Sequence, residues 1–133
     1  MVSPPSDRPN GLPQVLPQVL IVEDSRTMRE TLRVLLSLDF DCRVAVDGAD
    51  ALAQALAEPP ALILSDVEML GVDGYELLAQ VRARPALAQV RFVLLSGHAP
   101  RSGAPEPDLY LVKPVKPGIL IERLRALLQA PRP

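Results

Sequence analysis

Apolar runs of four or five residues alternate with amphipathic stretches along most of the chain. The strand-like runs lie at 18–22, 42–46, 61–65, 91–95 and 109–112. The helical patterns lie near 26–38, 49–58, 74–84 and 118–129. Apolar residues in these patterns recur three or four positions apart, and the first set on one helix face is Met28, Leu32, Leu35 and Leu36. Alternation at this length predicts an α/β fold, with a parallel sheet covered by helices on both faces.

Polar side chains follow four of the five predicted strands. Glu23 and Asp24 follow the first strand, Asp66 the third, Ser96 the fourth and Lys113 the fifth. In an open parallel sheet the ligand crevice lies beyond the carboxyl ends of the strands, where the strand order reverses. If the first and third strands are neighbours there, the three carboxylates converge.

Such a convergence has a direct electrostatic consequence. Two carboxylates about 4 Å apart repel each other by roughly 4 kcal/mol at an effective dielectric constant of about 20. A divalent cation relieves this repulsion, and Mg²⁺ is suited because it binds a few oxygen ligands, keeps several waters and leaves room for phosphate oxygens. Asp66 is then a candidate nucleophile toward phosphorus. Lys113 would offset the phosphoryl charge, and the Ser96 hydroxyl would donate to a phosphoryl oxygen.

Taken singly, each of these residues has a more ordinary interpretation. An aspartate after a strand is often a helix cap, an acidic pair is often a solvated loop, and a serine or lysine is often a turn hydroxyl or a surface charge. Their joint position at successive strand ends is what predicts a site.

Composition narrows the class of protein. The 133 residues suggest one domain, and 14 basic against 16 acidic residues provide no basic stripe for nucleic acid. Cys42 is the single cysteine, so no intrachain disulfide can form. No secretory signal and no apolar run of about 20 residues is present, which predicts a cytoplasmic protein that does not insert into membranes. Prolines at both ends predict a flexible leader at 1–17, a domain at 18–130 and a tail at 131–133.

Several short motifs occur at these strand ends and resemble one family. They are Val-Glu-Asp-Ser at 22–25, Asp-x-x-Met at 66–69 followed by Asp73-Gly74, Leu95-Ser96-Gly97, and Tyr110-x-x-Lys113-Pro114. Together they resemble the receiver domain of bacterial two-component response regulators over residues 18–129, with 23–29 particularly similar to single-domain chemotaxis receivers. The resemblance implies a flavodoxin-like, doubly wound sheet of five parallel strands in the order 2-1-3-4-5.

The resemblance also implies a phosphoacceptor switch of a phosphorelay. Asp66 would accept phosphate from a sensor histidine kinase or a phosphotransfer protein, with Mg²⁺ bound by Glu23, Asp24, Asp66 and the backbone carbonyl of Glu68. Such a domain is not an enzyme toward other substrates, since it catalyses only its own phosphorylation and dephosphorylation. Its output would be altered binding to a downstream protein that the sequence leaves open, with a phosphorylation-dependent dimer as one form.

Further residues receive roles from the same resemblance. Lys113 and Ser96 would assist phosphoryl transfer, and Ser96 with Tyr110 would form the switch, because a ring could fill the space that Ser96 vacates. Glu68 and His98 occupy positions at which the family tunes phosphoryl lifetime. Simpler roles remain open for two of these residues: Tyr110 as an ordinary strand aromatic and His98 as a loop residue.

Three features depart from the family pattern. Leu70 replaces the usual proline, and Gly97 replaces the commoner alanine. The largest departure is residues 97–108, where three prolines and two glycines occupy the place of a full helix. One interior proline costs about 3 kcal/mol in a helix, so the fourth helix is expected to be missing or reduced. The output surface that this helix normally helps to form should then be used differently.

Two other functions compete with the phosphoacceptor switch. The first is a receiver-like binding module that is not regulated by phosphorylation. The second is a haloacid-dehalogenase-like phosphatase with Asp66-Val67-Glu68 as its nucleophile motif, although that assignment leaves Glu23-Asp24 unexplained.

Overall fold

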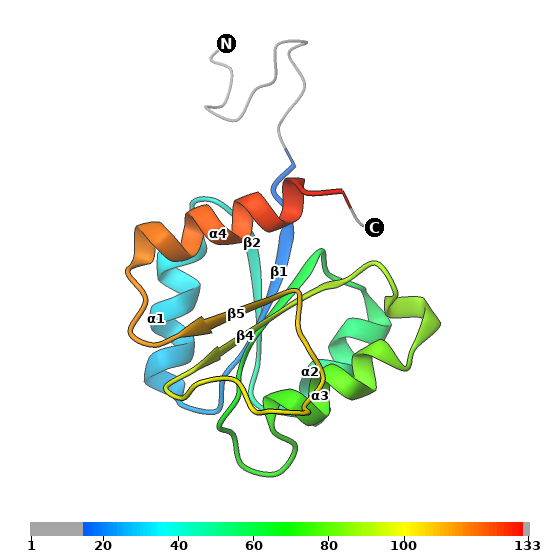
Figure 1. Ribbon diagram of the computed structural model, residues 1–133. Helices are drawn as coiled ribbons and strands as arrows, with labels where there is room; N and C mark the ends of the chain where they lie inside the picture. Colours follow the sequence, from blue (N-terminus) through cyan, green and yellow to red (C-terminus); the bar gives the residue numbers. More distant parts are fainter. Residues whose placement is uncertain (1–14, 132–133) are drawn as a thin grey trace, which may run out of the picture.

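The five strands form one parallel sheet in the computed structural model, which describes residues 15–131. The strands are β1 (Gln18–Val22), β2 (Asp41–Ala45), β3 (Leu62–Asp66), β4 (Arg91–Ser96) and β5 (Leu109–Val112). Their order is β2-β1-β3-β4-β5, so the predicted topology is confirmed (Figure 1). β1 lies between β2 and β3, and the strand order therefore reverses beside the carboxyl end of β1.

Helices cover both faces of this sheet, as the alternating pattern predicted. They are α1 (Arg26–Leu36), α2 (Gly48–Ala57), α3 (Gly74–Arg82) and α4 (Pro117–Gln129), with a short 3₁₀ turn, η1, at Pro85–Leu87. α1 and α4 pack on one face, and α2 and α3 pack on the other (Figure 1). Among residues 15–131, no helix is long and apolar enough to cross a membrane.

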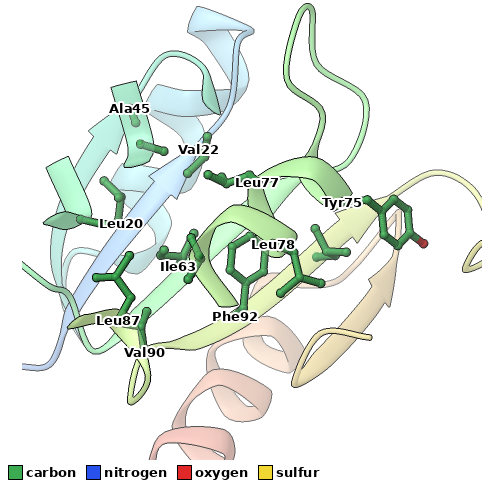
Figure 2. Packing of buried hydrophobic residues seen from close by; sticks show 14 of the residues in the cluster. Leu20, Val22, Ala45, Ile63, Tyr75, Leu77, Leu78, Leu87, Val90 and Phe92 are labelled. Atoms are coloured by element: carbon green, nitrogen blue, oxygen red, sulfur yellow. The ribbon is translucent and has the colours of Figure 1, made fainter. Parts of the chain in front are cut away.

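Alternate residues of each central strand belong to two separate cores. In β1, Val19 and Ile21 pack toward α1 and α4, whereas Leu20 and Val22 pack toward α2 and α3. Figure 2 shows the second core, in which Phe92 of β4 lies beneath α3. Both faces of β1 are buried, which explains its near-continuous apolar sequence.

The apolar face predicted for α1 is only partly buried. Leu32 and Leu36 enter the core, but Met28 and Leu35 remain 38% and 37% exposed. These two side chains line an apolar groove that α1 forms with the beginning of α4. Ser25 caps α1, and its Oγ accepts the Met28 N–H at 3.3 Å.

No helix forms between β4 and β5, so the expected loss of the fourth family helix is confirmed. Residues 97–108, hereafter the crossover loop, leave β4, pass beside the beginning of α3 and return to β5 (Figure 1). The far end of this loop is fixed at Asp108, whose carboxylate accepts the Phe92 N–H at 2.7 Å and pairs with Arg82 at 2.6 Å. The helix that follows β5 is α4. Residues 1–14 of the expected leader and 132–133 of the tail lie outside the described residues.

Candidate functional site

The predicted site residues occupy one edge of the sheet. Asp66 and Ser96 are the last residues of β3 and β4, Glu23 and Asp24 directly follow β1, and Lys113 directly follows β5. Because all five strands are parallel, their carboxyl ends lie on the same edge. The adjacency of β1 and β3, on which the predicted convergence depended, is present in the structure.

Asp66 is buried and faces a lysine ammonium. Its side chain is 8% exposed, and Lys113 Nζ lies 2.6 Å from Oδ1. Within the described residues Oδ1 has no donor in hydrogen-bonding geometry, so this contact is an ion pair. Burial raises the pKa of Asp66, Lys113 opposes that increase, and the charges of Glu68 and Asp24 add to it. Lys113 therefore offsets only part of the combined effect of burial and the neighbouring carboxylates on the pKa of Asp66.

Glu23 and Asp24 are held in place by backbone groups. Glu23 is 4% exposed, and its Oε2 accepts the Ser25 N–H at 2.9 Å. Asp24 Oδ2 accepts the Leu70 N–H at 3.1 Å, which ties the loop after β1 to the loop after β3. Burial raises the pKa of Glu23, the Ser25 N–H opposes this, and the neighbouring Asp66 and Asp24 raise it further.

These carboxylates suit a hard divalent cation. Across residues 15–131, no three acidic, histidine or cysteine side chains are already arranged to bind one ion. The carboxylate of Asp66 nevertheless raises the pKa of the buried Glu23, so ionising both groups together is unfavourable without a cation. A cation that binds one or two carboxylates and keeps its waters matches this donor set, and Mg²⁺ has that preference.

Ser96 links the acidic cluster to the crossover loop. Its buried hydroxyl donates to Glu68 Oε2 at 2.7 Å and accepts the His98 N–H at 3.0 Å. The His98 carbonyl in turn accepts the Tyr110 hydroxyl at 2.8 Å. Both of these hydrogen bonds use backbone atoms of His98, and residue 98 is exposed to solvent. Burial is the main cause of the raised pKa of Tyr110.

The structure adds Tyr75 and Arg101, which the sequence interpretation missed. The rings of Tyr75 and Tyr110 stack with centroids 6.4 Å apart, and Tyr75 lies at the margin of the core in Figure 2. The Arg101 guanidinium lies 4.7 Å from the Tyr75 centroid and pairs with Asp73 at 3.1 Å. The backbone N–H of Arg101 donates to the Tyr75 hydroxyl at 3.0 Å. The crossover loop is thus fastened to the first turn of α3.

Gly74 is a further residue whose importance the motif alone did not reveal. A Cβ at this position would lie 2.5 Å from the backbone oxygen of Asp66 and 2.9 Å from Val67 Cα. The beginning of α3 therefore packs directly on the backbone that carries Asp66. The motif Asp73-Gly74 marked this place in the sequence, but the close approach requires the fold.

Comparisons with known proteins identify the family. The model for the response regulator receiver domain matches residues 19–125. Two relatives from Pseudomonas aeruginosa are the response regulator protein FleR, 40% identical over 112 residues, and protein PilG, 30% identical over 115 residues. The matches cover 79% of this chain and 23% of FleR, and 82% of this chain and 85% of PilG. The chain thus spans less than a quarter of the length of FleR.

A solved structure supports the same assignment. Chemotaxis protein CheY4 of Vibrio cholerae superimposes with a TM-score of 0.76 at 27% identity, covering 85% of this chain and 99% of that one. The chain belongs to the response regulator receiver domain family of two-component systems, whose members are signalling switches. This membership favours the receiver interpretation over the phosphatase alternative.

Proposed function

We propose that this domain is a phosphoacceptor switch in which Asp66 accepts a phosphoryl group from the histidine of a kinase or phosphotransfer protein. The observation that carries the proposal is the ion pair of the buried Asp66 with Lys113, beside the acidic residues Glu23 and Asp24. A carboxylate with this surrounding is dehydrated, oriented and close to a cation that can share the phosphoryl charge.

The transfer step follows from these positions. A carboxylate oxygen of Asp66 attacks the phosphorus of a phosphohistidine, an O–P bond forms and the N–P bond breaks. The electron pair of the broken bond stays on the imidazole nitrogen, which takes up a proton. Lys113, 2.6 Å from Oδ1, offsets charge on the phosphoryl oxygens as the carboxylate is consumed. The Ser96 hydroxyl donates to one of those oxygens once the group is in place.

Bound Mg²⁺ would supply further charge stabilisation to the phosphoryl oxygens. Glu23, Asp24, Asp66 and the backbone carbonyl of Glu68 would hold it, together with waters. A histidine kinase as partner is in keeping with the relatives, since one matched protein is the sensor histidine kinase TmoS of Ectopseudomonas mendocina, of which this chain covers 8%.

The output in this proposal is a change in partner binding. The crossover loop replaces the family's fourth helix, and its first residues share hydrogen bonds with Ser96. A downstream protein that contacts this loop would therefore sense the state of the site. Dimerisation on phosphorylation stays a prediction.

Incubation with a small phosphodonor and Mg²⁺ tests the proposal. We expect the intact mass to increase by one phosphoryl group in the wild type and in Asp41→Asn, a control at the opposite end of the sheet. Asp66→Asn should show no increase. Continuous phosphate release from many substrates would support a phosphatase instead, and an unmodified wild-type chain would support a binding module that does not use phosphorylation.

A further inference from the structure

The Ser96 hydroxyl already donates its hydrogen bond to a carboxylate. Glu68 Oε2 accepts it at 2.7 Å, and Ser96 is fully buried. A serine hydroxyl carries one hydrogen, so it cannot donate to Glu68 and to a phosphoryl oxygen at the same time. The two acceptors therefore compete for one donor.

We propose that the Glu68 side chain is a latch that holds Ser96 in its resting position until a phosphoryl group on Asp66 displaces it. Glu68 is thus a positioning residue that acts through Ser96. The inference rests on the proposed function, since it requires a phosphoryl group at Asp66. It concerns the Glu68 carboxylate and is independent of the metal-binding role proposed for the Glu68 backbone carbonyl.

Hydrogen bonds connect Ser96 to the crossover loop, so release of the latch would affect the loop. Ser96 Oγ accepts the His98 N–H at 3.0 Å, and the His98 carbonyl accepts the Tyr110 hydroxyl at 2.8 Å. Tyr110 in turn stacks on Tyr75. When Ser96 reorients its hydroxyl, the turn at residues 96–98 and the two rings must adjust with it. The latch therefore sets how readily the crossover loop changes conformation when a phosphoryl group is present on Asp66.

A simpler effect of Glu68 has to be separated from the latch. Its carboxylate is close enough to Asp66 to contribute to the raised pKa of that residue, so it also repels any anionic group there. Repulsion acts whether or not Ser96 has a hydroxyl, whereas the latch requires that hydroxyl. A double-mutant cycle between positions 68 and 96 distinguishes the two contributions.

The chain provides its own conformational reporter for this experiment. It has no tryptophan and two tyrosines, and these are Tyr75 and Tyr110 of the stacked pair. Tyrosine emission therefore reports the switch region alone. Beryllofluoride, a phosphoryl mimic that binds carboxylates, serves as the probe at a fixed Mg²⁺ concentration, with its affinity measured by calorimetry.

The variants are Glu68→Ala, which removes the acceptor, and Glu68→Gln, which keeps an uncharged acceptor. Each is made as a single variant and in combination with Ser96→Ala. Glu68 is exposed but accepts a hydrogen bond from the buried Ser96 hydroxyl, so the folded fraction of each variant is checked by circular dichroism before binding is measured. Glu106→Ala, another exposed glutamate, is the control for the loss of one negative charge.

With Ser96 present, we expect Glu68→Ala to bind beryllofluoride about tenfold more tightly than the wild type, equivalent to about 1.4 kcal/mol. Glu68→Gln should fall between them, because a neutral acceptor forms a weaker hydrogen bond than a charged one. With Ser96→Ala, the gain should shrink to less than about threefold. The tyrosine signal of Glu68→Ala should change at correspondingly lower beryllofluoride concentrations.

Equal gains in both backgrounds would overturn the latch and leave repulsion as the explanation, and the absence of any gain would overturn it as well. Failure of the proposed function has a different signature. In that case the wild type and Asp66→Asn would respond to beryllofluoride in the same way, whatever residue occupies position 68.

Discussion

The contact between Gly74 and the backbone of Asp66 gives a sharp prediction for the substitution Gly74→Ala. A Cβ at position 74 would lie 2.5 Å from Asp66 O, 2.8 Å from Leu94 Cδ2 and 2.9 Å from Val67 Cα. Ordinary contact begins at 3.4 Å, so the closest approach falls 0.9 Å short. Two of the three atoms belong to backbone and cannot rotate away. The first turn of α3 must therefore move off the end of β3.

The magnitude follows from two opposing effects. Overpacking of this kind typically costs about 1–3 kcal/mol. Alanine is favoured over glycine inside a helix by up to about 1 kcal/mol, but position 74 is only the first residue of α3. The Gly74 N–H also donates to Val67 O at 3.0 Å, a bond that the displacement would lengthen. We expect a net destabilisation of about 1–2 kcal/mol, equivalent to a decrease in Tm of about 4–8 °C.

Thermal and urea unfolding followed by circular dichroism measure this effect. Gly118→Ala is the matched control, because Gly118 also lies in the first turn of a helix and has no atom within 4 Å of its added Cβ. Its stability should be unchanged or slightly higher. Gly74→Ala with a midpoint equal to or above that of the wild type, while the control behaves as stated, would refute the reasoning. The folded Gly74→Ala protein should also be phosphorylated more slowly, since the helix turn that packs on the Asp66 backbone has moved away.

Three further predictions address the site and the loop. Lys113→Ala should slow phosphorylation of Asp66 by at least about tenfold, measured by intact mass over time, because the cation 2.6 Å from Oδ1 is lost; an unchanged rate would argue against its role. The pKa values of Glu23 and Asp66 are higher in the folded protein than in the unfolded chain, so folding without metal favours their protonated forms. This contribution to stability is fully present below the unfolded-state pKa values and is lost as pH rises through the folded-state pKa values. Calorimetry should therefore show Mg²⁺ affinity falling as pH is lowered through the range just above about 4, where protons compete for these groups; affinity that is constant there would contradict the assignment. Arg101→Ala should speed amide exchange in the crossover loop and change tyrosine emission while costing less than about 1 kcal/mol, since its ion pair is half exposed; unchanged exchange would show that the Tyr75 contact does not restrain the loop.

The residues at strand ends were predictable because parallel strands impose a simple geometry. Once the alternating pattern indicated a parallel sheet, Asp66, Ser96 and Lys113 had to lie on one edge of it. The absence of a helix in the crossover loop was predictable for a different reason. Proline removes a backbone donor and clashes with the preceding turn, and that effect is local to the sequence.

Contacts between loops were not predictable in this way. The hydrogen bond from Ser96 to Glu68 and the stacking of Arg101 on Tyr75 each join residues more than 20 positions apart. Periodicity does not describe the path of a loop, so it contains no information about these pairs. The partial exposure of Met28 has a related cause. It lies on the predicted apolar face of α1, but the packing of α4 leaves a groove there instead of a closed core.

The loss of a helix between β4 and β5 changes how the site communicates with its surroundings. A helix satisfies most of its own backbone groups through hydrogen bonds within the helix. The crossover loop instead bonds outward: His98 N–H donates to Ser96, Arg101 N–H donates to Tyr75, and Asp108 N–H donates to Phe92 O at 2.9 Å. The first of these partners is itself a site residue. A change at Ser96 would therefore alter the hydrogen bonding of the loop backbone directly, with no helix between the strand-end site and the exposed part of the loop.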